Sequence, residues 1–299
     1  MPSYSTAFEF RADRLATLYF FYWIKRRGPR LPHVRIPILM YHSIGEASGR
    51  RVHPYYETRT AVSVLARHMK FLADHHYSVI GLDEVAKRVS PGARWTAKCV
   101  AITFDDGYQD VYTHAFPILK QYGFTATVFL PTAYIGRVPK SFNGKECLIW
   151  SEVRELHRAG IIFGSHTVSH PELKSLSTSS IAYEVAHSKK VIEEEIGDSI
   201  RSFSCPYAFP EHDRAFVREL RALLEINEYD NGVSTIVGRA GRGHERFFLP
   251  RLPMNTFDDL SFFQAKLEGA YDWIHIPQHL FKTVKKLWFL SRSGTDLRV

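Results

Sequence analysis

The sequence has few cysteines and no long hydrophobic run. Its 299 residues include three cysteines, Cys99, Cys147 and Cys205, which are far apart in the chain. An odd and widely spaced set indicates neither a disulfide framework nor a cysteine-rich zinc module. No apolar stretch approaches the roughly 20 residues that a membrane-spanning helix needs. With 45% hydrophobic residues, the chain can still bury a large core, so we expect one large domain with free thiols.

The chain also has fewer acidic than basic residues. The chain has 39 Lys and Arg against 31 Asp and Glu, a formal net charge of +8. This balance suits an anionic surface, either membrane headgroups or an acidic polymer. The basic residues are not concentrated enough to indicate a nucleic-acid partner.

Aromatic and basic residues are concentrated near both ends of the chain. Residues 15–24 read LATLYFFYWI and precede Lys25, Arg26 and Arg27, and residues 280–292 read LFKTVKKLWFLSR. A secretory signal would place the positive charge first, so we recognise no signal peptide and expect a location in the cytoplasm or at the cytoplasmic face of the membrane. Each segment is either an interfacial helix in peripheral membrane contact or a helix that packs on the domain. We therefore divide the chain at 1–35, 36–256 and 257–299.

Predicted strands and helices alternate along most of the chain. This pattern favours a parallel sheet, and the number of units favours a closed or distorted α/β barrel over an open sheet. The carboxyl ends of parallel strands converge on one rim. Five polar or turn-forming positions lie at such ends, namely His42, Asp105, Asp106, His166 and the dipeptide Pro206-Tyr207.

Two adjacent carboxylates follow the buried strand predicted at residues 99–104, which reads CVAITF. Asp105 and Asp106 would repel each other unless a cation neutralised one of them, and Gly107 permits a sharp turn directly afterwards. The pair is therefore either a metal ligand beside a general base or an ordinary Asp-Asp-Gly turn.

Two histidines, His166 and His170, are four residues apart in SHTVSH. Pro171 favours a strand end that turns into a loop, and such a turn can still bring both rings to one ion. Histidine pairs are weak evidence alone in a chain with 15 histidines. With an aspartate from a neighbouring strand, the pair would form a two-His, one-carboxylate site that leaves open positions for water and substrate.

The motifs TFDDGY, SHTVSH, PELKSLS and FSCPY together resemble the polysaccharide deacetylase superfamily, the family-4 carbohydrate esterases with a nodulation-type deacetylase domain. The resemblance extends from Ile36 to Met254 and implies a distorted (β/α) barrel with a divalent metal, zinc or alternatively cobalt or nickel. It makes Asp106, His166 and His170 the metal ligands and Asp105 the general base. The backbone N–H of Tyr207 would stabilise the oxyanion.

The opening IPILMYHSI resembles the permuted branch of the superfamily that includes poly-N-acetylglucosamine deacetylases. In that branch the catalytic acid comes from the N-terminal strand, which makes it His42 here. The alternatives are a core role for His42 and an acid at His275. Many relatives carry Arg-Pro-Pro-Tyr-Gly where this chain has residues 204–208, SCPYA. Arg251 could replace that missing arginine at Asp105, or it could form a surface ion pair.

The resemblance implies removal of N-acetyl groups from an amino sugar in a polysaccharide or a lipid-linked glycan precursor. An N-acetylated glycan is the expected partner. Two alternatives remain open. One is a catalytically silent glycan-binding or scaffold protein that keeps the fold, and the other is the same hydrolytic site acting on a small cyclic amide or an O-acetyl group.

Overall fold

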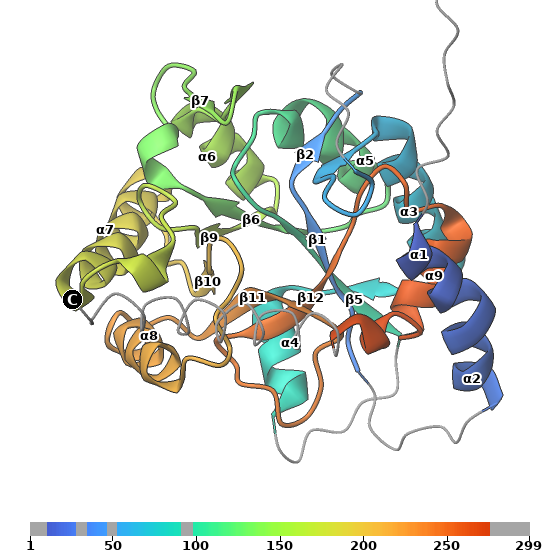
Figure 1. Cartoon of the computed structure of the whole chain (residues 1–299). Helices are drawn as coiled ribbons and strands as arrows, with labels where there is room; N and C mark the ends of the chain where they lie inside the picture. Colours follow the sequence, from blue (N-terminus) through green and yellow to red (C-terminus); the bar gives the residue numbers. More distant parts are fainter. Residues whose placement is uncertain (1–10, 28–34, 47–52, 91–97, 276–299) are drawn as a thin grey trace, which may run out of the picture.

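A closed barrel of parallel strands forms the centre of the molecule (Figure 1). The computed structural model describes residues 11–27, 35–46, 53–90 and 98–275. In the order in which they pair, the barrel strands are β1 (Ile38–Tyr41), β12 (Leu249–Pro253), β11 (Asn231–Val237), β10 (Ser202–Ser204), β9 (Ile162–Ser165), β6 (Thr127–Leu130) and β5 (Cys99–Phe104). β1 pairs with both β12 and β5, which closes the barrel. The predicted α/β barrel is confirmed.

The barrel is distorted where it closes. The first two residues of β5 pair with the short strand β4 (Ser78–Val79), and the next four pair with β1. Two small sheets lie apart from the barrel strands. They are formed by β2 (Ser43–Ile44) with β3 (Arg59–Thr60), and by β7 (Ser141–Phe142) with β8 (Lys145–Glu146).

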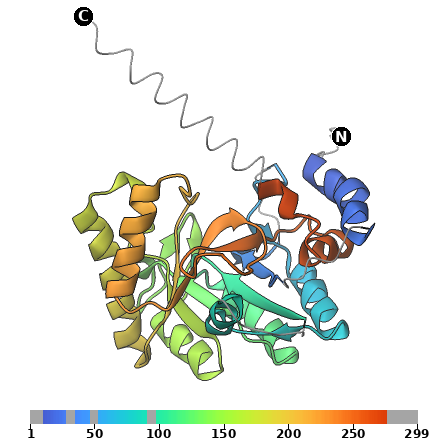
Figure 2. The same cartoon turned by 90° about the horizontal axis from the view of Figure 1, so that it is seen from below.

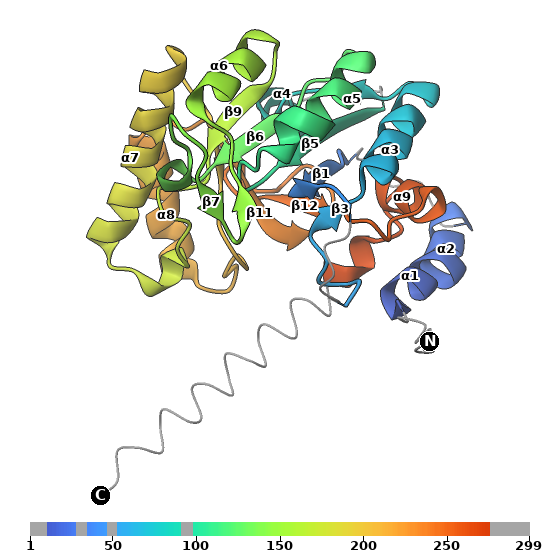
Figure 3. The ribbon, with the colours of Figure 1, turned by 90° about the horizontal axis from the view of Figure 1, so that it is seen from above.

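Helices surround the barrel, and the arrangement is visible from below and from above (Figures 2 and 3). The helices that connect successive strands are α3 (Val62–Asp74), α4 (Leu82–Val89), α5 (Phe116–Gln121), α6 (Trp150–Arg158), α7 (Thr178–Ile196) and α8 (Arg214–Ile226). Shorter turns are η2 (Val111–Ala115), η3 (Thr132–Tyr134) and η4 (Leu173–Ser175). The strands are buried on both faces, which explains their nearly continuous apolar sequences.

The boundaries of α7 follow from its sequence. The Ser177 side chain caps the helix by accepting a hydrogen bond from the N–H of Ser180, and Gly197 ends it in the left-handed region at φ 74°. Both are the residue types that such positions prefer. The start of α6 is different, since its cap position belongs to Ile149, which has no side-chain hydroxyl. There the N–H of Ile149 donates to Glu152, so the acidic residue rather than the hydroxyl satisfies this helix end.

Pro117 lies within a helical stretch without breaking it. The preceding turn, η2, is a π-helix, and Pro117 occupies the first turn of α5. A proline near a helix start removes no intrahelical hydrogen bond. The change from π to α geometry therefore lets the helical stretch from η2 through α5 continue through the proline.

The N-terminal helix packs against the end of the described chain. It comprises α1 (Ala12–Ala16), the π-helical η1 (Thr17–Phe21) and α2 (Tyr22–Arg27), and it contacts α9 (Leu260–Leu267). The indole N–H of Trp273, in η5 (Asp272–Ile274), donates to Thr17 at 3.0 Å, and the Phe21 and Trp273 rings stack at 4.7 Å. Of the two interpretations of residues 15–24, packing on the domain is therefore observed for one side of the helix.

Among the described residues, no helix combines the length and the apolar character that crossing a bilayer requires. The predicted C-terminal segment at 280–292 lies outside the described residues. The divisions at residues 35 and 256 stay predictions. All three cysteines are free and buried.

Buried His68 makes the fold sensitive to acid. Its Nδ1 is 2.9 Å from the Tyr41 hydroxyl, and its Nε2 is 2.7 Å from the carbonyl oxygen of Asp258, to which it donates. Burial, only partly offset by Asp258, lowers the pKa of His68 to about 4. Below pH 6.5 the unfolded chain binds a proton that the folded chain does not, so stability falls as the pH drops.

From pH 7 to pH 5 we expect this residue to lower the free energy of unfolding by about 2 kcal/mol. Urea unfolding of the wild type and of His68→Gln at both pH values measures it. The wild type should lose about 2 kcal/mol more than the variant, and equal losses would contradict the assignment.

Candidate metal centre

Three metal-ligating side chains meet at the carboxyl ends of the strands. Donor atoms of Asp106, His166 and His170 all lie within 4.8 Å of one another. The Asp106 Oδ1 atom is 3.6 Å from Nε2 of His166 and 3.4 Å from Nε2 of His170. The sequence motif therefore corresponds to a compact cluster, formed by residues of the loops that follow β5 and β9.

The two imidazoles are held differently. The Nδ1 atom of His166 is 2.8 Å from the carbonyl oxygen of Ser204, to which it donates when Nε2 is the ligand atom. A hydrogen bond from the other ring nitrogen fixes the orientation of a ligating histidine. Burial and the neighbouring His166 lower the pKa of His170 to about 4, so its ring is neutral at pH 7. Its Nδ1 is buried without a hydrogen-bond partner among the described residues. A neutral, incompletely satisfied imidazole fits a metal ligand.

Backbone strain is concentrated in this cluster. Four residues other than glycine have positive φ here, Asp106 (70°), Thr167 (69°), His170 (55°) and Tyr207 (56°). This region is costly for residues with a Cβ, and more so for the β-branched Thr167. Such strain persists where surrounding contacts fix the backbone, and it is typical of functional sites.

Glu184 fixes the loop that carries the two histidines. From α7, its Oε2 accepts hydrogen bonds from the backbone N–H of Val168 at 2.7 Å and of Ser169 at 2.9 Å. Its Oε1 accepts from the Ser169 hydroxyl at 2.7 Å. Glu184 was not predicted to belong to the site. The sequence feature that could have indicated it is a charged residue among the mainly apolar positions on the inner side of this helix.

Arg251 forms an ion pair with both carboxylate oxygens of Asp105. Its Nη1 and Nη2 donate to the two carboxylate oxygens of Asp105, each at 2.7 Å, and the guanidinium is 0% exposed. The surface ion pair considered from the sequence is therefore wrong, and Arg251 lies within β12 rather than at a strand end. Burial would raise the pKa of Asp105, but Arg251, His166 and His42 together outweigh burial and hold that pKa well below its usual range. The carboxylate is thus ionised at neutral pH.

Ser204 provides the space for this arrangement. Its hydroxyl accepts from Nη2 of Arg251 at 3.1 Å and lies 3.4 Å from Oδ1 of Asp105. Ser204 is also the position where many relatives carry the motif arginine. The guanidinium that binds Asp105 comes from β12, and the small Ser204 side chain accepts a hydrogen bond from it.

His42 and Tyr207 complete the set of predicted residues. Tyr41 in β1 is paired with Phe104 in β5, so His42 and Asp105 both follow directly at adjacent strand ends. Burial would raise the pKa of Asp106, but His166 and His42 lower it, so both imidazoles belong to the electrostatic surroundings of this carboxylate. The Tyr207 ring centroid lies 4.8 Å from that of His170.

His275 belongs to another region. It follows η5, and burial together with the charges of Arg35 and His275 lowers the pKa of His244. The alternative assignment of the acid to His275 stays a prediction.

Asp110 holds the segment that follows His42. The Ser43 hydroxyl donates to its Oδ2 at 2.6 Å, and the Oδ1 atom is buried without a hydrogen-bond partner among the described residues. Burial raises the pKa of Asp110 despite the Ser43 bond. Asp110 was not predicted to belong to the site either, although it lies four residues after the aspartate pair.

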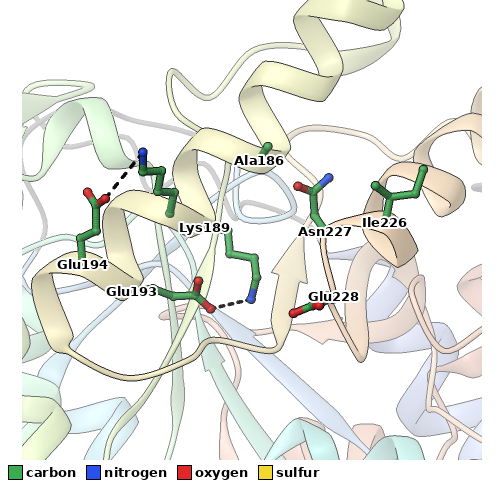
Figure 4. Close-up of a pocket in the computed structure, with 8 residues that line it drawn as sticks. Ala186, Lys189, Glu193, Glu194, Ile226, Asn227 and Glu228 are labelled. Carbon is green, nitrogen blue, oxygen red and sulfur yellow. Dashed lines mark hydrogen bonds and ion pairs between the residues drawn. The ribbon is translucent and has the colours of Figure 1, made fainter.

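A separate depression lies between α7 and α8 (Figure 4). It has a volume of about 610 Å³, and its charged side chains are largely paired. Lys189 binds Glu193 at 2.6 Å, and Lys190 lies 3.7 Å from Glu194. Lys189 also donates to the carbonyl oxygen of Ile200. The depression is therefore a charged groove between packed helices, away from the metal cluster.

Comparisons with known proteins point to one family. The polysaccharide deacetylase family model matches residues 93–223. YxkH of Bacillus subtilis (strain 168), which is named as a candidate polysaccharide deacetylase, is 32% identical over 247 residues, covering 83% of this chain and 80% of that protein. Poly-beta-1,6-N-acetyl-D-glucosamine N-deacetylase of Staphylococcus aureus (strain MSSA476) is 25% identical over 155 residues, covering 49% of this chain and 52% of that protein.

Solved structures show the same fold. The deacetylase PplD of Streptococcus pyogenes superposes with a TM-score of 0.67 at 23% identity, covering 79% of this chain and 99% of that chain. IcaB of Ammonifex degensii superposes with a TM-score of 0.65 at 19% identity, covering 78% of this chain and 97% of that chain. At these identities the likeness concerns the fold alone, whereas the match to YxkH extends over most of both sequences. The chain therefore belongs to the polysaccharide deacetylase family.

Proposed function

We propose that this chain is a metal-dependent hydrolase that removes N-acetyl groups from an amino sugar of a polysaccharide or glycan precursor. The observation that carries the proposal is the cluster of Asp106, His166 and His170 directly beside the Asp105–Arg251 ion pair. The substrate class comes from the relative named as a poly-beta-1,6-N-acetyl-D-glucosamine N-deacetylase.

The donor set of two imidazoles and one carboxylate suits zinc, with cobalt or nickel as alternatives. When bound, the metal supplies polarisation of the acyl oxygen and a lower pKa for water. Asp106, His166 and His170 would hold it.

The other residues of the site would transfer the protons and stabilise the oxyanion. Asp105 accepts the proton of the attacking water, and Arg251 keeps this carboxylate ionised and fixes its orientation. The N–H of Tyr207 donates to the developing oxyanion. His42, at the adjacent strand end, protonates the departing amine. The products are acetate and the free amino sugar.

Two other functions compete with this proposal. A silent glycan-binding protein would keep the fold and release no acetate, although this chain retains each acid, base and ligand of the family pattern. Hydrolysis of a small cyclic amide or an O-acetyl group would use the same residues on another acyl donor.

Acetate release from a panel of acetylated oligosaccharides, lipid-linked sugars, O-acetyl esters and cyclic amides tests the proposal. We expect release from N-acetylated glycans that a chelator abolishes and added zinc restores. His170→Ala should lose at least about 100-fold in metal affinity, because one of three protein ligands is gone. Metal content after dialysis measures this loss. His157→Ala, a change at a half-buried histidine on α6, is the matched control. No release from any glycan by the metal-loaded wild type would overturn the proposal.

A substitution at Asp110 tests the proposal that His42 is the catalytic acid. Because it holds Ser43, next to His42, Asp110→Asn should reduce amide hydrolysis by about tenfold, which is part of the 10² to 10⁴ that acid catalysis contributes. On 4-nitrophenyl acetate, whose leaving group needs no proton, the loss should stay under about twofold. Ser43→Ala should behave in the same way. Equal losses on both substrates would contradict the role of Asp110.

A further inference from the structure

The N-terminal helix has two unlike sides. On the inner side Asp13 and Thr17 are buried, and Asp13 accepts hydrogen bonds from Arg11 and from the Tyr271 hydroxyl. On the outer side four large apolar residues are exposed. They are Tyr19 (72% exposed), Phe20 (59%), Trp23 (55%) and Ile24 (52%), and we refer to them as the outer aromatic face.

The helical period explains the outer aromatic face. Residues three and four apart in a helix lie on one side, and the pairs 19 and 23, 20 and 23, and 20 and 24 have that spacing. Soluble proteins rarely leave such a group of aromatic side chains without a partner. The helix lies beside α9 at the periphery of the molecule (Figure 3), and none of the four residues of the outer aromatic face belongs to the buried core.

The charged residues around the outer aromatic face indicate which kind of partner can bind there. The helix ends in exposed Lys25, Arg26 and Arg27, and the Arg27 guanidinium lies 5.2 Å from the centroid of the Trp23 ring. Its one acidic residue, Asp13, is buried on the inner side. The exposed side therefore presents aromatic rings beside positive charge, with no negative charge from the helix itself.

We propose that the outer aromatic face docks on an anionic phospholipid surface. Tyr and Trp prefer the boundary between headgroups and acyl chains, and adjacent Arg side chains bind anionic headgroups. The 16 residues of the helix would lie in the plane of the surface, because its inner side stays attached to the barrel through Thr17, Phe21 and Trp273. Docking then anchors the barrel rigidly, and the helix need not detach.

Vesicle flotation of the full chain tests this proposal. We expect the wild type to float with vesicles of phosphatidylglycerol and phosphatidylcholine, and much less with phosphatidylcholine alone or in high salt. The double change Arg26→Gln with Arg27→Gln should weaken partitioning by roughly 30-fold, which follows from about 1 kcal/mol for each basic residue. Phe20→Ser with Trp23→Ser should weaken it at least about tenfold, because two interfacial rings are lost.

A spectroscopic measurement locates the contact. Brominated lipids quench tryptophans that reach the acyl region, so quenching in the wild type should decrease in Trp23→Phe, which keeps an aromatic ring at the site. Matched controls are Tyr183→Ser and Lys190→Gln, which alter an exposed aromatic and an exposed basic residue on α7 and should leave flotation unchanged. Each variant should keep its Tm within about 2 °C, because surface changes alter stability little.

Three results would overturn the proposal. The wild type could fail to float with anionic vesicles, or the helix variants could float as the wild type does. Light scattering could also show a lipid-independent dimer that Phe20→Ser with Trp23→Ser abolishes, in which case a second copy of the chain is the occupant.

Discussion

Replacing Asp105 with Asn is expected to reduce acetate release at least about 10³-fold while the metal stays bound. The amide keeps the shape of the carboxylate but cannot accept a proton from water, and general bases contribute 10² to 10⁴ to such reactions. The ligands Asp106, His166 and His170 are untouched, so the metal content of the purified variant should equal that of the wild type.

Asp230→Asn is a matched control, because Asp230 is an exposed carboxylate that lies 3.8 Å from Arg201 on the surface. It should retain full activity. An Asp105→Asn variant within about tenfold of the wild type would mean that another group acts as the base. Loss of metal together with activity would instead assign Asp105 to metal binding.

Arg251→Met is expected to be the most destabilising single substitution in the site. It leaves the carboxylate of Asp105 buried without its cation, and breaking a buried ion pair in this way costs about 3 to 5 kcal/mol. Activity should fall as well, because Asp105 loses both of its guanidinium bonds. Urea unfolding at pH 7 measures the stability.

The double variant Asp105→Asn with Arg251→Met separates the two effects. It removes both charges, so it should recover much of the lost stability and none of the activity. The control Arg201→Met, at the exposed pair with Asp230, should cost less than about 1 kcal/mol. If Arg251→Met were as stable as the wild type, the ion pair would contribute little to the fold.

The ion pair between Asp105 and Arg251 also determines in which direction the stability changes with pH. The pKa of Asp105 is lowered in the folded state, so its contribution to stability is complete above the usual carboxylate pKa and is lost as the pH falls through the acid range. In Arg251→Met the cation that lowers this pKa is gone. The difference in stability between wild type and variant should therefore shrink below about pH 4, where the unfolded carboxylate is protonated.

The sequence by itself determined the elements and the cluster of ligands. The strand that ends at Phe104 followed from its apolar run, and the barrel class followed from the alternation of strands and helices along the chain. The proximity of the aspartate pair and His166 followed because residues at the carboxyl ends of parallel strands converge on one rim, whereas the choice of Asp106 and His170 as ligands came from the resemblance to the family.

Only the tertiary structure decided the contacts between residues far apart in sequence. Arg251 and Asp105 are separated by 146 positions, and nothing local shows that Ser204 leaves room for their bidentate contact. Glu184, Asp110 and the packed side of the N-terminal helix depend in the same way on how separate elements meet. Hydrophobic patterns specify which face of an element is buried, but the partner of a buried polar group is set only when the chain closes around it.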